Sequence, residues 1–457
     1  MQSTKLSCSL ICAAICAFLL YSSVSSVYII GICNIISLFV GINAIKKIQG
    51  SFLSPLILIT ICLYIFHSGH LWLSLINISP SSFLTSFDYE YQTTNYDYIL
   101  NVYREITILL SLFIVVSILF VKPINKAFKG RECGTVLVTN RFRKSFFLLY
   151  IISMFFELKR AIAVAATSYG EGYLYGSSIE QYIVGFVNVI LLLFLYIYRN
   201  DKNKFNLYLG LQLFRTFFIM FFVGNRGSSI IYLIVTAFIV TNYSYLASRK
   251  RYIRIVSILA VGFMLIALPF ISATRGGSRE NMSVSQFVEK KNPIESFLEE
   301  FGGTVANVFL TKEYVDAYGS TNGIQIIGTS LSILPGSTSL FGDIIRENVS
   351  IGMKLNNFAN RQGLGGSLLS QLYFNFSEFW LLCLSVAVVS LLMVWTSNQL
   401  MNNGGSLFYT LFLLCLFSGL ITWVRGEWYD VITQVKMCVY VIILLKISKN
   451  NLLIINE

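Results

Sequence analysis

The chain carries arginines whose neighbours are glycines and small hydroxyl residues, a pattern typical of anion binding. Arg226 lies in "GNRGSS", and Arg275 and Arg279 lie in "TRGGSRE". A guanidinium presents a planar fork of donors that matches two phosphate oxygens, and adjacent glycines let the backbone approach a ligand closely. These arginines therefore predict a site for a phosphate or a diphosphate, with the binding of lipid headgroups as the structural alternative for the pair in "TRGGSRE".

Three further arginines extend this set. Arg215 lies in the middle of an apolar segment, where a charge is costly. If its helix continued, Arg226 would lie three turns away on the same face, at about 16 Å. Arg215 then either lines a polar track toward the outer surface or is a paired structural residue. Arg361 lies in a glycine-rich stretch, and Arg425 begins "RGEWYD", where an ion pair with the two acids explains it as well as a site does.

The remaining polar residues inside apolar segments have simpler interpretations. Glu157 and Arg160 stand three residues apart on a predicted helix and are expected to neutralise each other. His67 and His70 have a spacing that suits two metal ligands, but they are the chain's only two histidines and have no cysteine-rich partner. No motif for ATP or a dinucleotide occurs. We therefore expect neither a metal nor a cofactor.

These residues belong to a chain whose composition is that of a membrane protein. It is 55% hydrophobic and 12% charged, whereas a soluble protein has about 25% charged residues. Apolar segments of about 17 to 25 residues can cross a bilayer, and twelve can be placed. The predicted spans are 6–22, 27–45, 53–75, 102–121, 145–166, 182–198, 205–223, 228–246, 254–272, 377–396, 406–424 and 431–447. The expected fold is an all-α polytopic membrane protein.

The distribution of basic residues predicts the orientation of these spans. Loops that are rich in Lys and Arg stay in the cytoplasm. With twelve spans, 19 of the 34 basic residues and only 3 of the 22 acids fall on one side. Both termini are therefore expected in the cytoplasm, with the first segment retained as a helix. The formal net charge of +12 reports this topology, and a nucleic-acid partner is not expected.

Most of the chain outside the bilayer is expected on the opposite side, in one large structured loop. Asn292 and Pro293 predict the start of a helix in this loop, Gly302 its end, and a second amphipathic helix is expected from Thr304 to about Tyr318. The sequence thus divides into residues 1–271 with nine spans, residues 272–376 with the large loop, and residues 377–457 with three spans.

Arginines on the outer side of a membrane suit an anionic ligand that is partly embedded in the bilayer. Glycosyl transfer outside the cytoplasm lacks nucleotide sugars, so its donor must be activated inside and delivered through the membrane. A polyprenyl-diphosphate sugar meets this need, because arginines would stabilise the charge that develops on the leaving diphosphate. The aromatic stretches "FDYEYQTTNYDY" and "GEGYLYG" suit sugar faces, although aromatic belts at membrane interfaces also explain them.

Two motifs resemble those of a known family. "GLGGSLLSQLYFNFSEFW" is similar to the G-G-S-x-x-(A/S)-E-x-Y-x-N-F-G stretch of bacterial O-antigen polymerases, the Wzy-type oligosaccharide repeat-unit polymerases, and "GNRGSSIIYLI" is similar to their G-x-R-G-x segment. The resemblance implies a GT-C-like glycosyltransferase of the inner membrane. Such an enzyme transfers the growing chain from undecaprenyl diphosphate to a new lipid-linked repeat unit. A flippase and a chain-length regulator of the same pathway are its implied partners.

The resemblance and the arginines together define the predicted site. Gln371 stands where the family usually has Glu, and Ser377 stands where it has Gly, so the motif itself lacks a candidate base. Glu280 is therefore expected to activate the acceptor hydroxyl, with Glu378 as second choice. The predicted catalytic residues are Glu280, Arg226 and Arg275. The predicted substrate-binding residues are Arg215, Arg279, Arg361, Gly365, Gly366, Ser367, Tyr373, Asn375 and Arg425.

Two other functions remain open at this stage. An O-antigen ligase uses a similar donor but transfers to the lipid A core, and ligases of that kind carry a His in the large outer loop, which this loop lacks. A lipid-linked oligosaccharide flippase or another transporter would show two related halves, and no internal repeat is found. The pattern therefore favours an inverting, metal-independent polymerase.

Overall fold

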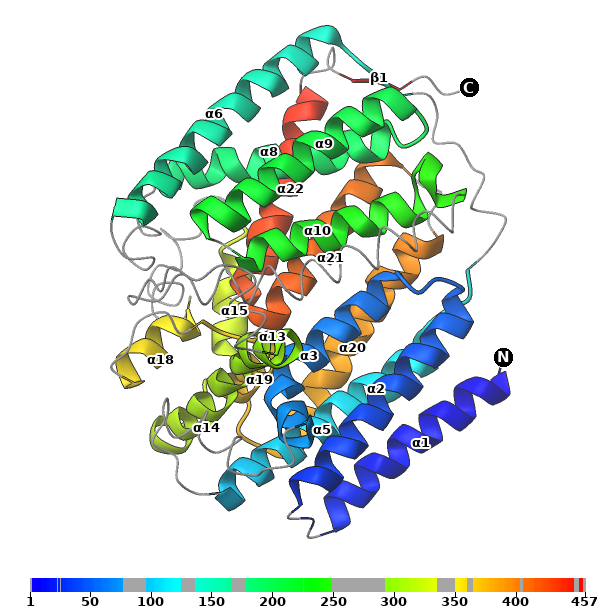
Figure 1. The fold of residues 1–457 in the computed structure, drawn as a ribbon, viewed down its shortest axis with the longest axis vertical. Coiled ribbons are helices and arrows are strands. Elements are labelled where there is room, and N and C mark those ends of the chain that lie inside the picture. The colour runs from blue at the N-terminus through cyan, green and yellow to red at the C-terminus, as the bar shows by residue number, and fades with distance from the viewer. Residues whose placement is uncertain are drawn as a thin grey trace. The chain divides into compact units, whose positions relative to one another are not determined.

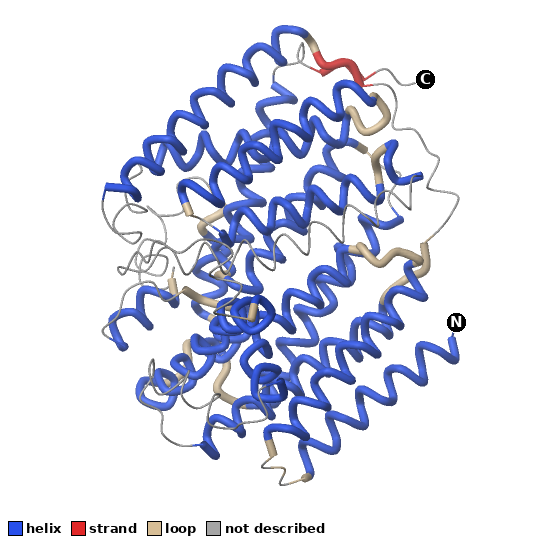
Figure 2. Tube along the Cα trace, in the orientation of Figure 1, coloured by secondary structure: helices blue, strands red, loops and turns tan. Residues whose placement is uncertain are grey.

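The computed structural model describes residues 2–22, 24, 26–76, 96–124, 136–166, 178–224, 226–248, 292–334, 350–359, 365–402, 406–447 and 452–454. Nearly all of these residues lie in helices (Figures 1 and 2). The described strands are two short antiparallel segments, β1 (Val136–Val138) and β2 (Leu452–Ile454). The predicted helical class is confirmed.

Nine helical segments among these residues are long and apolar enough to cross a membrane. They are formed by α1 (Gln2–Tyr21), α2 (Val27–Gln49), α3 (Pro55–Ile76), α5 (Tyr96–Phe120), α8 (Ser178–Ile197), α9 (Lys202–Phe218) with the π-helical η2 (Ile219–Val223), α20 (Phe379–Asn402), α21 (Leu407–Arg425) and α22 (Trp428–Ile447).

Two further predicted spans are also helical. They correspond to α6 (Asn140–Ala166), which carries charges near both ends, and α10 (Arg226–Asn242), which is short for a span. The predicted span 254–272 lies outside the described residues. The total of twelve spans therefore stays a prediction, as does the division at residues 271 and 376.

The chain folds into two compact units that each combine distant parts of the sequence. The first consists of Met1–Ile124, Ser283–Met401 and Trp423–Ile432. The second consists of Asn125–Met282, Asn402–Thr422 and Thr433–Glu457. The connection between α21 and α22 thus belongs to the first unit.

In the first unit, α1, α2, α3 and α5 pack side by side, and short helices of the large loop pack against α3 and one another (Figure 1). These short helices are α13 (Pro293–Gly302), the 3₁₀ turn η4 (Gly303–Val305), α14 (Ala306–Tyr318), α15 (Ile324–Leu331), α18 (Ile351–Ala359) and α19 (Leu368–Asn375). Helix α13 lies against α3, whereas α19 lies against α14 and α15.

The two predicted helices of the loop are confirmed. The Asn292 side chain caps α13 by accepting a hydrogen bond from the Ile294 N–H, and Pro293 occupies the first turn. Helix α14 starts at Ala306 rather than Thr304, because the three residues after Gly302 form the 3₁₀ turn. It ends at Tyr318, where Gly319 adopts a positive φ of 82°.

The stretch before α20 contains a helix that the sequence analysis missed. There the sequence analysis placed the end of the large loop at residue 376 and the start of a span at residue 377, with no helix between them. Instead Leu368–Asn375 form the separate helix α19, and all eight of its residues are buried. Extended backbone at Phe376 ends this helix, and α20 begins at Phe379. The family-like motif is therefore packed in the interior of the first unit.

Candidate functional site

Several predicted site residues lie outside the part of the chain that the structure describes. They are Glu280, Arg275, Arg279 and Arg361, together with most of the two aromatic loops. Arg226 forms the first residue of α10. Glu378, the second candidate base, is exposed just before α20. The roles assigned to these residues stay predictions.

Ser367 caps the motif helix α19 and is fully buried. Its hydroxyl accepts a hydrogen bond from the Ser370 N–H at 3.2 Å, and the Ser370 hydroxyl accepts one from the Ser367 N–H at 2.7 Å. This reciprocal capping satisfies two donors at the start of the helix and is worth about 1 kcal/mol. The serine of the motif thus begins the helix that carries the other motif residues.

His67 of α3 connects this cap to a membrane helix. Its Nδ1 lies 2.9 Å from the carbonyl oxygen of Leu63, so Nδ1 carries the proton. In the neutral ring Nε2 is then an acceptor, and it lies 3.3 Å from the Ser367 hydroxyl. His70 donates through Nε2 to the carbonyl oxygen of Glu299 at 2.8 Å. Among the described side chains, no three potential metal ligands come together.

Gln371 occupies the centre of a buried network of amide side chains. Its Oε1 accepts hydrogen bonds from Trp423 Nε1 at 2.6 Å and from the Trp428 N–H at 2.7 Å. Both of these groups can only donate, so the orientation of the Gln371 amide is determined and its Nε2 faces away from them. That nitrogen donates to Gln325 Oε1 at 2.6 Å. Gln371 therefore joins α19 to α15 and to the connection between α21 and α22.

Asn375 completes this network, which we call the amide cluster (Gln325, Gln371 and Asn375). Its Nδ2 donates to Gln325 Oε1 at 3.1 Å and to the carbonyl oxygen of Gln371 at 2.8 Å. Its Oδ1 accepts from the Thr321 hydroxyl at 3.0 Å. The three amide residues are almost completely buried, so their polar atoms bind one another in place of water. In this structure the motif asparagine holds α19 in place.

The two glycines before Ser367 have different surroundings. A Cβ on Gly366 would lie 2.5 Å from Cγ of Glu427, whereas the space around Gly365 is open. Glu427 accepts from the N–H groups of Ile351 and Gly352 at 3.1 and 2.8 Å, and so caps the start of α18. Burial raises the pKa of Glu427, and its hydrogen bonds with α18 partly offset that effect. Gly366 provides the space in which this carboxylate lies.

Arg425, the last residue of α21, contacts two aromatic rings, which also pack against each other at 5.5 Å between their centroids. Its guanidinium carbon is 5.6 Å from the ring centroids of both Phe66 and Phe301. Such cation–π contacts are worth about 0.5 to 2 kcal/mol. Of the two nearby acids, Glu427 caps α18, and Asp430 accepts from the Glu427 N–H at 2.8 Å. Within the first unit, the arginine thus lies against both α3 and α13.

Tyr373 leads to a charged cluster that the sequence analysis did not find. Its hydroxyl donates to Glu105 Oε2 at 2.8 Å, and Lys312 Nζ lies 2.8 and 2.7 Å from the two oxygens of Glu105. The side chains of Glu105 and Lys312 are each 24% exposed. Burial, followed by the Glu105 carboxylate, raises the pKa of Tyr373 well above its ordinary value, so its hydroxyl stays protonated. A signal for Glu105 existed, since it is an acid at the edge of the apolar segment "REITILL".

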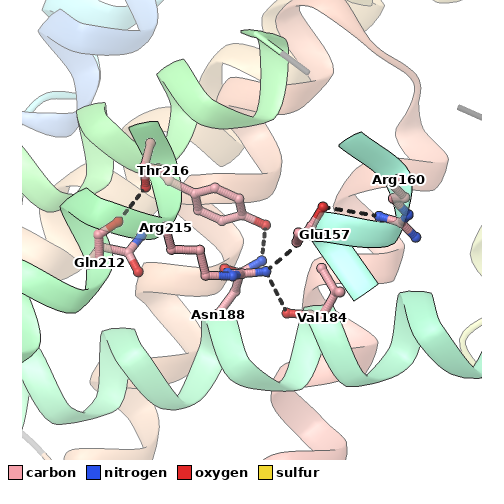
Figure 3. A network of polar contacts seen from close by, with 8 residues as sticks. Glu157, Arg160, Val184, Asn188, Gln212, Arg215 and Thr216 are labelled. Atoms are coloured by element: carbon pink, nitrogen blue, oxygen red, sulfur yellow. Dashed lines mark hydrogen bonds and ion pairs between the residues drawn. The ribbon is translucent and has the colours of Figure 1, made fainter. Parts of the chain in front are cut away.

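In the second unit, Arg215 is 1% exposed and lies in a network between α6, α8 and α9 (Figure 3). Its guanidinium lies 3.6 Å from Glu157 and donates to Asn188. Glu157 also lies 3.7 Å from Arg160, as expected from their spacing. The structure therefore shows the pairing that was the structural alternative for Arg215. Its assignment as a substrate-binding residue stays a prediction.

The continuous helix assumed between Arg215 and Arg226 does not form. Helix α9 turns into the π-helical segment η2, and Gly224 ends that segment with a positive φ of 83°. Helix α10 then begins at Arg226. The expected spacing of three turns on one helical face is wrong, because a glycine in the left-handed conformation interrupts the helix.

Comparison with known proteins identifies the family of this chain. A family model described as "O-antigen polysaccharide polymerase Wzy" matches residues 6–453. No curated protein and no solved structure gives a significant match. The match includes both motifs and all the predicted spans, which confirms the resemblance. The chain belongs to the O-antigen polysaccharide polymerase Wzy family.

Proposed function

We propose that this protein joins lipid-linked oligosaccharide repeat units on the periplasmic face of the bacterial inner membrane. The growing chain is transferred from undecaprenyl diphosphate to the non-reducing end of a new unit, and the lipid diphosphate is released. No metal takes part. The family match over residues 6–453 is the observation that carries this proposal.

The packing of the motif helix supports it. Helix α19 is held through His67, the amide cluster and Glu105, which come from membrane helices and from the large loop. A site for sugars at a membrane surface needs such rigid attachment, because transfer depends on the alignment of donor and acceptor. In this proposal Arg226, Arg275, Arg279 and Arg361 bind the diphosphates of the two substrates.

Deletion of the protein tests the proposal directly. A polymerase mutant still makes, transports and ligates single repeat units, so its surface polysaccharide should carry one unit per lipid anchor. The measurement is the length distribution of surface polysaccharide on a gel, with re-expression of the intact chain as the control.

The same experiment separates the two rival functions. A complete absence of surface repeat units would contradict the polymerase proposal, because that phenotype belongs to a missing flippase or ligase. Accumulation of lipid-linked units inside the cell would then favour the flippase. Accumulation of polymerised lipid-linked chains in the periplasm would favour the ligase.

A further inference from the structure

We propose that Glu105 takes the proton from the acceptor sugar hydroxyl during chain transfer. This inference rests on the proposed function and assigns the base that the motif lacks. It replaces Glu280, which the sequence analysis favoured. The argument comes from the two oxygens of this carboxylate and from the side chains that hold them.

The two oxygens of Glu105 are not equivalent. Oε2 accepts from the Tyr373 hydroxyl at 2.8 Å and from Lys312 at 2.7 Å, which uses both of its lone pairs. Within the described part of the chain, Oε1 has one such contact, at 2.8 Å from Lys312. One lone pair of Oε1 thus remains for a further donor. The Glu105 side chain is 24% exposed, so the carboxylate is not sealed inside the protein.

Glu105 is held firmly from two sides, as a catalytic group must be. Tyr373 lies in the buried helix α19, and burial raises the pKa of its hydroxyl, which therefore remains a donor. Lys312 comes from α14, which packs against α19, and its ammonium lies 5.8 Å from the Tyr373 ring centroid. The carboxylate therefore has a defined position in the first unit.

The proposed step balances in atoms and charge. The acceptor oxygen forms a bond to the anomeric carbon of the donor sugar while the bond from that carbon to the diphosphate oxygen breaks. The electron pair leaves with the lipid diphosphate. The hydroxyl proton moves to Oε1 of Glu105 and later passes to water. Lys312 and Tyr373 act as positioning residues, because they contact Glu105 and not the reacting atoms.

The test replaces Glu105 in cells that lack the chromosomal copy of the protein. Glu105→Gln keeps an oxygen for the Tyr373 hydroxyl but cannot take a proton. It should yield surface polysaccharide of single units and lower the rate of chain extension about 10²- to 10⁴-fold in membranes supplied with the strain's own extracted lipid-linked repeat units. The matched control is Glu313→Gln, which removes one carboxylate from α14, next to Lys312. It should leave chain length unchanged.

Lys312→Met distinguishes a base from a structural ion pair. It removes the same ion pair but retains the Glu105 carboxylate, so chains should still form, at a rate reduced far less than by Glu105→Gln. Tyr373→Phe should slow extension about fivefold, the effect of one hydrogen bond, mainly through kcat rather than through KM for the acceptor. The amount and thermal stability of each variant in the membrane show that it has folded.

Two results would overturn the inference: normal chains from Glu105→Gln, or equal losses in Glu105→Gln and Lys312→Met. If normal chains from Glu105→Gln came with single units from Glu280→Gln, the role of base would return to Glu280. None of these affects the proposed function as long as the deletion strain displays single units. Conversely, a deletion strain without any surface units would contradict the proposed function whatever the Glu105 variants do.

Discussion

At the residue scale, the two adjacent glycines of the motif should respond differently to the same substitution. Gly366→Ala would place a Cβ 2.5 Å from Cγ of Glu427 and displace the carboxylate that caps α18. Crowding of this kind costs about 1 to 3 kcal/mol. The expected result is a lower thermal unfolding temperature of the purified protein in detergent, together with shorter surface chains.

Gly365→Ala is the matched control. Gly365 has open space around it, and its φ is not positive, so alanine should change the free energy of unfolding by no more than about 0.5 kcal/mol. Equal destabilisation by the two substitutions would show that the Gly366 contact with Glu427 does not explain the motif.

Gln371 allows a second test at this scale. Gln371→Glu restores the residue usual in the family motif, but a carboxylate cannot donate to Gln325 Oε1, which lies 2.6 Å from the present amide nitrogen. If the Gln325 amide turned to donate, it would lose the hydrogen bond from Asn375. In the first case one oxygen of residue 371 lacks a donor, and in the second one N–H of Asn375 lacks an acceptor; either costs about 1 to 3 kcal/mol.

The expected outcome for Gln371→Glu is a protein that unfolds at lower temperature and extends chains no faster than the natural chain. Thermal unfolding and the extension assay in membranes measure these two quantities. Faster extension would mean that position 371 does serve as a base and that the amide cluster is dispensable.

At the element scale, α3 and α13 cross with almost no space between their backbones. A Cβ on Gly302 would lie 2.5 Å from the backbone nitrogen of His70, and backbone cannot move aside as a side chain can. Gly302→Ala should therefore separate the helices and reduce protein stability by several kcal/mol. A Cβ on Gly303 would lie 3.8 Å from Nε2 of His70, which is an ordinary contact distance, so Gly303→Ala should be tolerated. Thermal unfolding of both variants measures the difference, and equal tolerance would contradict this crossing.

The buried network of α6, α8 and α9 also makes an element-scale prediction. Among the described residues, Arg215→Met leaves Glu157 with Arg160 at 3.7 Å as its remaining ion-pair partner, and loss of one partner of a buried pair costs about 3 to 5 kcal/mol. Adding Glu157→Gln removes the buried charge and should recover much of that loss. The free energies of unfolding of Arg215→Met, of Glu157→Gln and of the double variant give the coupling energy between the two side chains. A double variant as unstable as the sum of the single variants would contradict the pairing.

The sequence was sufficient for elements whose signals are local. Asn292, Pro293 and the following glycines predicted α13 because capping acts within a few residues. Helix α19 was missed because its partners are remote: Ser367 binds His67, and Gln371 binds Gln325 and Trp423. The pattern of residues that are adjacent in the sequence does not indicate contacts between residues that are far apart in the chain.

The same distinction applies to the candidate site. The motif residues Ser367, Tyr373 and Asn375 were identified from the sequence, but their contacts were not. Glu105 was identified only through its hydrogen bonds with Lys312 and Tyr373, which lie far from it in the chain. The sequence showed that the charge of Arg215 lies in an apolar segment, where it is costly, but only the fold showed that Glu157 is its partner.

At the scale of the whole molecule, the charge distribution predicts which side of the membrane each loop occupies. Cys133 lies in a basic loop and is expected in the cytoplasm, whereas α14 belongs to the large loop that is expected on the outer side. In a background lacking the other eight cysteines, Ala317→Cys, at an exposed position of α14, should react with a membrane-impermeant maleimide once the outer membrane is permeabilised. Cys133 should react only after the inner membrane is disrupted. Protection of position 317 after permeabilisation of the outer membrane, with the inner membrane intact, would reverse the topology, and an outward-facing diphosphate site would then be untenable.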